Sequence, residues 1–485
     1  MELVETTGSM SRREMFRLTM ILVVVLASLV VFSGIQHRLS AGLFLVVGSL
    51  FALLLSWRLE TVALLQFVYI TLIPIPYVGQ NFPVIPFYFN YFSNFPAVIA
   101  MMGVLIIHKL HHRVSGPLIR RDMTGLFVGL FLAMTVFEMI RGFAQNYRFD
   151  FMLNLTAYIV LYFIYFFFRD YFVMKNNHYS WLKYMTLYGL VVSLFYFFLV
   201  YTVFTDIFSF VIYREITHHS YYALASVPLG LGYFALGKTT RQKVLWFLLV
   251  SVFMVQVILG QQRAVWLAIV VVGFTFITLY FFKDSVSLGR IIKYFLVLLS
   301  FSALMFLLLI TVSSLLKVDL SVLFTRWQGL KQLKDPSIAM RIYDSKRAIA
   351  LVGDNWLTGM GMGAVVRSSP RGMQSFFFDQ SYMLTYFIGG IPYVGLLALI
   401  YLSALWNTLV VIYRSKDRRR KILSIAIASS FVGQLVAAMT DLTIYMFGFM
   451  FVWIILLSVS TILRVETEEE ISGEREAVNA LRTNE

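Results

Sequence analysis

Residues 314–381 read SLLKVDLSVLFTRWQGLKQLKDPSIAMRIYDSKRAIALVGDNWLTGMGMGAVVRSSPRGMQSFFFDQS. This is a long polar stretch in a chain whose other polar connections are short. Long connections without regular repeats are usually either functional or disordered. Trp327, Ile342, Trp356 and Phe378 are among its apolar residues, and such residues supply surface to bury, which argues against disorder. We therefore expect the chemistry of the protein to reside in this segment.

The composition on either side of the segment is that of a membrane protein. Of 485 residues, 59% are hydrophobic and 13% are charged, and the mean hydropathy is +0.79. Apolar runs of roughly 17 to 22 residues recur along the chain, each long enough to cross a hydrocarbon core. The alternating pattern of barrel strands is absent, so these runs are expected to be helices. We expect an all-α polytopic membrane protein, forming a single integral membrane domain over residues 1–485.

The sequence predicts about fourteen transmembrane helices. Their expected ranges are 18–34, 41–57, 61–77, 92–108, 122–140, 151–168, 182–204, 220–237, 244–260, 264–282, 294–313, 382–412, 422–440 and 442–463. The first apolar run, Leu18–Phe32, resembles the core of a signal peptide, but no small-residue cleavage site follows it. It is therefore interpreted as the first transmembrane helix. The chain has no cysteine, so neither a disulfide nor a thiolate metal site is expected.

The distribution of Lys and Arg predicts the orientation in the membrane. Connections rich in these residues alternate with poor ones, and the richest run is Arg414–Lys421. By the positive-inside rule both termini are then cytoplasmic and residues 314–381 are extracytoplasmic. The net charge of +15 is explained by this topology, so no nucleic-acid partner is inferred. For the basic run itself, a topology signal and a binding site for a partner or anionic lipid are both open interpretations.

No cytoplasmic connection carries a Walker-type glycine loop, a paired-carboxylate motif or a soluble domain. The acidic tail that includes Glu466 and Glu468–Glu470 is expected to be a short solvated helix or disordered. Nothing in these segments predicts ATP-driven chemistry on the cytoplasmic side.

The long loop carries more positive charge than orientation requires. Nine cations stand against five carboxylates, which leaves a net charge of +4. Such a surface suits an anionic ligand held near the membrane, such as a lipid diphosphate. The alternative is a solvated loop with incidental charge.

Within the loop, the sequence predicts a surface helix over residues 337–352. Asp335 and Pro336 are a helix-start signal, and apolar residues then recur at near-helical spacing until Gly353. We expect this amphipathic helix to lie flat at the membrane surface. The glycines of Gly359–Gly363 predict a sharp turn or a close approach of the backbone to another group.

The order of residues from Arg341 to Gly363, RIYDSKRAIALVGDNWLTGMGMG, resembles the signature of the O-antigen ligase and Wzy-type polysaccharide polymerase superfamily. Asp379–Leu384, DQSYML, is similar to the motif that follows it in that family, and Gly260–Ala264, GQQRA, to its Ser-Arg-Gly-Ala turn. His218–Ala223, HHSYYA, is a weaker similarity. The strong part of the resemblance covers residues 330–400. Two departures are evident, because Asp379 stands where the family carries His and Trp356 where it carries Pro.

The resemblance implies glycosyl transfer on the outer face of a bacterial cytoplasmic membrane. The donor would be a glycan on undecaprenyl diphosphate, and the reaction would need neither a metal nor another cofactor. Polymerisation of repeat units into surface polysaccharide is the first expectation, and ligation of a finished glycan to a terminal lipid or protein is the second. Implied partners are membrane lipids and other assembly proteins, such as a flippase and a chain-length regulator. The rival from a different class is a lipid-linked oligosaccharide flippase.

The candidate site residues follow from this chemistry. Arg341 and Arg263 are expected to stabilise the charge that develops on the diphosphate leaving group. Asp379 is the candidate base for the acceptor hydroxyl, with an orienting role or a helix N-cap as alternatives. The candidates for substrate binding are Arg326, Arg214, Arg347, His218, His219, Gln380 and Tyr382. Snorkelling of Arg263, helix-end histidines, and polar packing by Gln434 and Asp441 are the structural interpretations.

Overall fold

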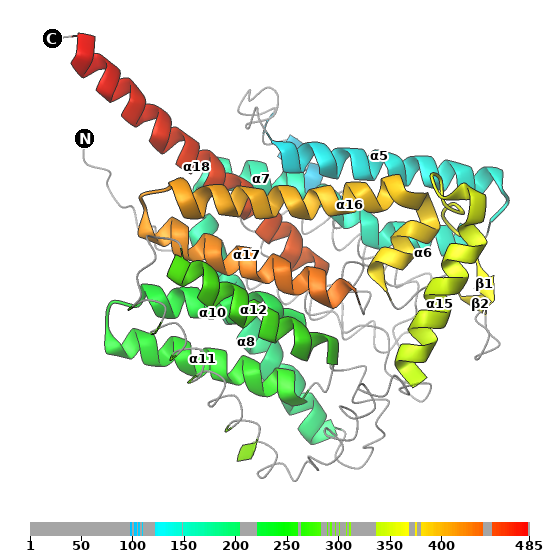
Figure 1. Cartoon of the computed structure of the whole chain (residues 1–485), viewed down its shortest axis with the longest axis horizontal. Coiled ribbons are helices and arrows are strands. Elements are labelled where there is room, and N and C mark those ends of the chain that lie inside the picture. Colours follow the sequence, from blue (N-terminus) through cyan, green and yellow to red (C-terminus); the bar gives the residue numbers. More distant parts are fainter. Residues whose placement is uncertain are drawn as a thin grey trace, which may run out of the picture.

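A computed structural model describes residues 122–147, 149–203, 221–259, 263–282, 336–367, 374–375, 380–439 and 449–483, together with single residues between 98 and 311. This part of the chain is almost entirely helical (Figure 1). Six of its helices are long and apolar enough to cross a membrane: Met123–Ala144, Thr240–Val257, Ala264–Phe282, Ser381–Arg414, Arg418–Ala438 and Met450–Gly473. The protein is therefore a helical membrane protein.

The helices and strands of the described residues are, in chain order, α5 (Met123–Ala144), α6 (Phe149–Ile159), η1 (Val160–Phe163), α7 (Ile164–Lys175), α8 (His178–Val203), α10 (Ala223–Leu236), α11 (Thr240–Leu259), α12 (Arg263–Phe282), α15 (Pro336–Val352), η3 (Gly353–Asn355), β1 (Val366–Arg367), β2 (Gln374–Ser375), α16 (Ser381–Arg414), α17 (Arg418–Ala438) and α18 (Phe449–Thr483). The helices predicted at 18–34, 41–57 and 61–77 lie outside the described residues. Of those predicted at 92–108 and 294–313, only single residues are described, and these are helical.

Most predicted limits differ from the structure by a few residues, and three predicted helices differ from it by more. The one at 151–168 is divided by η1 and runs on to Lys175 as α7. The one at 442–463 continues as α18 through the acidic tail to Thr483, so the tail is neither short nor separate. The one at 382–412 is α16, which is broken at Gly389 and Gly390, where the backbone angles are not helical. These differences arise from contacts between segments, which periodicity does not report.

Small residues allow the central helices to pack closely. α17 contacts α10, α12 and α16, and a β-carbon on its Gly433 would lie 2.3 Å from Val272 of α12. Likewise, a β-carbon on Gly232 of α10 would lie 3.4 Å from Ala426 of α17. In a membrane, such close backbone approach is a main source of helix association. α16 in turn packs along α5 and α18 (Figure 1).

Two hydrogen bonds establish which helix ends lie together. The Tyr382 hydroxyl donates to the carbonyl of Leu435 (3.1 Å), so the start of α16 lies beside the end of α17. Arg418 donates to the carbonyl of Ala235 (3.2 Å), so the start of α17 lies beside the end of α10. Because α10, α11 and α12 follow one another through short connections, α12 begins at the end of the bundle where α17 finishes.

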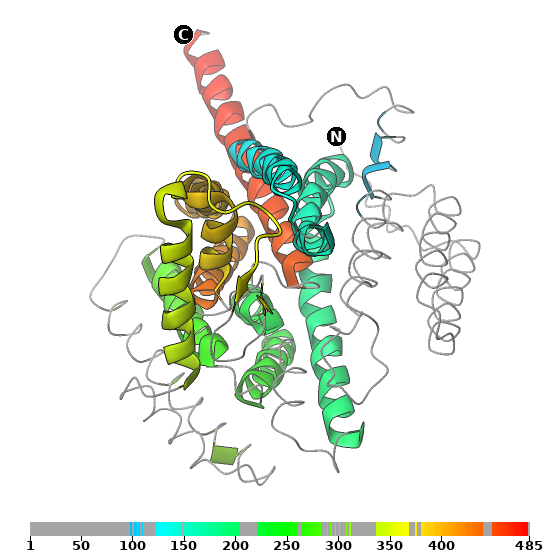
Figure 2. The ribbon, with the colours of Figure 1, turned by 90° about the vertical axis from the view of Figure 1, so that its right-hand side faces the viewer.

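α15 crosses the bundle at this same end. Its axis is steeply inclined to α5 and α16 in Figure 1, and in Figure 2 it lies in front of helices seen nearly end-on. We call this the α15 end of the bundle and the other the opposite end. The prediction of a helix within the long loop is confirmed, because α15 covers Pro336–Val352 and Gly353 follows with a φ of +45°. Asp335, its expected cap, lies outside the described residues.

Candidate functional site

Gln380 joins α15 to the start of α16. The Ser345 hydroxyl lies within hydrogen-bond distance of both the Arg341 carbonyl (2.7 Å) and Gln380 Oε1. Gln380 is the N-cap residue of α16, but its side chain does not bond the helix N-terminus. Gln380, which the sequence predicts to belong to the site, therefore contacts α15. This contact links α15 to the start of α16.

The glycine segment fills the break in α16. Loss of helical geometry at Gly389 and Gly390 would leave the carbonyls of Phe387 and Ile388 without their usual partners. They accept instead from Met360 N–H (2.7 Å) and Gly361 N–H (2.9 Å). The close approach predicted for residues 359–363 is therefore made to the protein's own backbone.

Arg141 and Glu138, on the last turns of α5, hold the same segment from the other side. The Arg141 guanidinium donates to the carbonyl of Thr358 and to that of Gly359 (2.8 Å). The Glu138 carboxylate is fully buried and lies 3.2 Å from Arg141, while the Glu138 carbonyl accepts from Met362 N–H (3.3 Å). The sequence analysis treated Arg141 only as a loop cation. Glu138 stands three residues before Arg141, and this spacing on a helix was the sequence signal for the pairing.

Four of the predicted site residues have described side chains. Arg341 and Arg347 lie on α15, and both are partly buried. Arg347 donates to the hydroxyl of Tyr343 (2.9 Å), one turn earlier on the same helix. Gln380 and Tyr382 lie at the start of α16 and contact α15 and α17, respectively. The structure therefore brings these four to the α15 end of the bundle.

The remaining candidates are described only in part or not at all. Arg263 is the first residue of α12, which begins at the α15 end, but its side chain is not described. Five candidates lie outside the described residues: Asp379, Arg326, Arg214, His218 and His219. Asp441 does too. The N-cap position of α16 is occupied by Gln380, whose side chain makes no cap hydrogen bond, and both the base and the N-cap alternatives for Asp379 stay predictions.

The α15 end is expected to be positively charged because of its arginines. The sequence predicts no metal centre there. Within the described ranges, no three His, Asp or Glu side chains gather as a metal site would require. Metal-independent chemistry remains a prediction.

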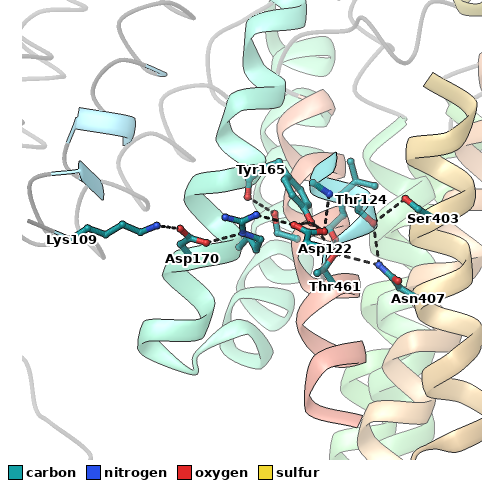
Figure 3. A network of polar contacts seen from close by, with 12 residues as sticks. Lys109, Asp122, Thr124, Tyr165, Asp170, Ser403, Asn407 and Thr461 are labelled. Atoms are coloured by element: carbon teal, nitrogen blue, oxygen red, sulfur yellow. Dashed lines mark hydrogen bonds and ion pairs between the residues drawn. The ribbon is translucent and has the colours of Figure 1, made fainter. Parts of the chain in front are cut away.

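A second polar group of side chains, which the sequence analysis did not find, lies toward the opposite end (Figure 3). Arg169 of α7 forms ion pairs with Asp122 (2.9 Å) and Asp170 (2.7 Å), and Asp170 also pairs with Lys109. Asp122 caps α5 by accepting from Gly125 N–H (2.7 Å). The hydroxyl of Tyr165 donates to the same carboxylate (2.8 Å).

The network continues into α16 and α18. The Asn407 amide donates to the Thr124 hydroxyl (3.1 Å) and to that of Thr461 (3.3 Å). Arg464 donates to Asn407 Oδ1 (2.9 Å) and to Glu468 (2.8 Å). The network therefore contains three cations, Lys109, Arg169 and Arg464, and three carboxylates, Asp122, Asp170 and Glu468. Paired in this way, the buried charges of this network favour one arrangement of the helices.

Comparison with models of known protein families found no match, and comparison with curated protein sequences found none either.

Proposed function

We propose that this chain is a membrane glycosyltransferase that polymerises undecaprenyl-diphosphate-linked oligosaccharide repeat units into surface polysaccharide. The reaction would take place on the outer face of a bacterial cytoplasmic membrane. The observation that carries the proposal is the grouping of Arg341, Arg347, Gln380 and Tyr382 with the start of α12 at one end of the bundle. The basic run Arg414–Lys421 lies at the opposite end, as the proposed orientation requires.

Each residue has a defined chemical role in this proposal. Breaking the anomeric C–O bond transfers negative charge to the diphosphate, and the guanidinium groups of Arg341 and Arg263 stabilise that charge as it develops. Asp379 removes the proton from the acceptor hydroxyl, which attacks the anomeric carbon from the other side. The contact between Ser345 and Gln380 supports this arrangement because it joins the arginine-bearing helix to the residue that follows Asp379 in the sequence.

Ligation of the glycan to a lipid or protein acceptor is the close alternative, since the donor and its diphosphate are the same. A flippase is the rival from another class, and two features bear on it. Transporters often have broken helices and charges at mid-membrane depth. Here α16 is broken, Arg169 and Asp170 are buried, and the Asp122 side chain is 5% exposed. The polar side chains are thus not confined to one end of the bundle.

The depth of these two features still favours the enzyme. The break leaves 24 residues from Ile391 to Arg414, which is about 36 Å of helix and enough to span the membrane alone. It therefore lies near the α15 end of α16. The charged network begins at Asp122, which precedes α5, so it lies near the opposite end.

The glycan profile of a deletion strain tests the proposal. Loss of long chains with single repeat units still displayed is the result expected for a polymerase. Accumulation of long lipid-linked chains would identify a ligase, and trapping of units on the inner leaflet would identify a flippase. A profile unchanged by the deletion would overturn all three.

A further inference from the structure

Gln434 is a buried amide that has no hydrogen-bond partner among the described residues. It lies on α17, four residues before the helix ends, and no part of it is exposed. Neither its Oε1 nor its Nε2 has a hydrogen-bond partner among the residues that the structure describes. Leaving buried donors and acceptors unsatisfied costs about 1–3 kcal/mol each. A buried amide of this kind in a native protein therefore requires an explanation.

The position of Gln434 connects it to the α15 end of the bundle. Gly433, its neighbour on one side, packs against Ala268 and Val272 of α12, the helix that begins with Arg263. The carbonyl of Leu435, its neighbour on the other side, accepts from the Tyr382 hydroxyl. Gln434 thus lies on a segment of α17 that packs between α12 and α16, and both of these helices carry candidate site residues.

We propose that the Gln434 amide binds a hydroxyl group of the glycan portion of the lipid-linked substrate. This inference rests on the proposed function and names a residue for substrate recognition. An amide offers a carbonyl acceptor and an NH₂ donor side by side, and a sugar hydroxyl can both donate and accept. The amide is uncharged, so it suits the sugar, whereas the arginines suit the diphosphate. The sequence analysis had interpreted Gln434 as polar packing, but the amide makes no hydrogen bond to any residue that the structure describes, and it lies near the end of the bundle that carries the candidate site.

Because the Gln434 amide has no hydrogen-bond partner among the described residues, an experiment can distinguish substrate binding from a structural role. Replacing an unsatisfied polar group with an apolar one of similar shape removes its desolvation cost, so stability should be retained or increased. Loss of a substrate contact should at the same time reduce turnover. Opposite changes in stability and activity are typical of residues kept for function.

Ser424 provides a matched control. Its Oγ is also fully buried and has no hydrogen-bond partner among the described residues, and it lies on the same helix. It is ten residues before Gln434, toward the opposite end of the bundle. Ser424→Ala therefore makes the same physical change at a position away from the candidate site.

The experiment compares Gln434→Met, Gln434→Leu and Ser424→Ala in the deletion strain and as purified protein in detergent. We expect all three to reach wild-type abundance and to unfold at or above the wild-type temperature. Glycan transfer should fall about tenfold or more in both Gln434 variants, as when a site built to hydrogen-bond a hydroxyl loses that contact, and should be unchanged in Ser424→Ala.

Two results would overturn the inference. Normal transfer in both Gln434 variants would show that the amide does not contribute to substrate binding. A fall in unfolding temperature that accompanies the loss of transfer would show a structural role. Failure of the proposed function is read separately, from the deletion strain itself, whose glycan profile would then match that of the parent strain.

Discussion

The backbones of Gly359 and Gly390 pack directly against each other, although the two residues belong to different segments. A β-carbon on Gly359 would lie 2.6 Å from the nitrogen of Gly390, and the φ angles are +62° and +66°. Ile391 N–H also donates to the carbonyl of Trp356 (2.9 Å), which extends the contact by one residue. The segment after α15 and the break in α16 therefore form one unit that admits only glycine at its centre.

Gly390→Ala should destabilise the protein by roughly 2–4 kcal/mol, because it combines a positive φ with overpacking. The new β-carbon would lie 2.4 Å from the carbonyl oxygen of Trp356. Gly395→Ala is the matched control, since no described atom lies within 4 Å of its β-carbon position. This control should gain roughly 0.5–1 kcal/mol, because alanine favours the helix. Thermal unfolding in detergent measures the stability of both variants. Equal unfolding temperatures would show that the contact between Gly359 and Gly390 does not require glycine.

Arg169→Met should cost roughly 3–5 kcal/mol, because it leaves the carboxylates of Asp122 and Asp170 buried without the cation that joins them. Glu468→Ala is the control at the exposed edge of the same network, where the side chain is 46% exposed. Its effect should be well under 1 kcal/mol, on the order of other surface ion pairs. Similar losses in the two variants would show that the network does not specify helix packing.

Introduced cysteines test the proposed orientation against a background free of native cysteine. Asn146→Cys, at the exposed end of α5, should react with an impermeant reagent in intact cells. Lys416→Cys, exposed between α16 and α17, should react only after the membrane is opened. The neighbouring Ser415 is 1% exposed, so a cysteine there would fail to react on either side. Reaction of the cysteine at position 416 in intact cells would show that the orientation is the reverse of the one proposed.

His178 should make the protein less stable in mild acid. It precedes the span predicted at 182–204, and burial, with Arg419 and Arg420 nearby, lowers the pKa of His178 to about 4. The unfolded chain, with a pKa near 6.5, then takes up a proton first, so stability is lost as the pH falls from about 6.5 toward 4. Between pH 7.5 and 5.5 the loss should be about 1 kcal/mol.

The control for this prediction is His178→Phe, which cannot titrate and retains an aromatic ring. Its unfolding temperature should change less with pH than that of the wild type. His178 Nε2 also lies 3.3 Å from the Glu466 carboxylate. If that contact governed the titration, the wild type would instead gain stability as the pH falls.

Arg341→Lys should lower glycan transfer while the protein still accumulates in the membrane. Lysine keeps the charge but loses the planar fork that binds two phosphate oxygens. The loss should correspond to roughly 2–4 kcal/mol of transition-state stabilisation, by analogy with other preorganised donors. Arg241→Lys, an exposed cation at the start of α11, serves as the control and should transfer normally. Normal transfer by Arg341→Lys would exclude the proposed role.

The features that the sequence predicts well are those set by neighbouring residues. α15 begins at Pro336 and ends before Gly353 because a proline at the first turn and a glycine with positive φ act locally. The break in α16 had a local signal too, in Gly389, Gly390 and Pro392, but its partner is the segment from Trp356 to Gly361. Such a pairing depends on the tertiary fold, so periodicity alone predicts an unbroken helix.

The network around Arg169 was missed for the same reason. Asp122, Arg169 and Arg464 each stand at the edge of an apolar run, where charge is usually assigned to the membrane surface. Only the packing of α7 and α18 against α5 and α16 places these charges together. These charged residues are visible in the sequence, but the sequence does not show which of them form pairs.

The length of α18 has a mechanical consequence. Its 35 residues form one helix about 52 Å long, anchored by Thr461 and Arg464 and projecting far past the bundle to Thr483 (Figure 1). Contacts continue past Arg464, because Arg420 donates to Glu470 (2.9 Å) and Thr467 is fully buried. Thirteen residues lie beyond Glu470, which is about 20 Å of helix. A tilt of about 10° at Glu470 would displace the tip by about 3 Å, so a small rearrangement among the side chains around Glu470 would be amplified at Thr483.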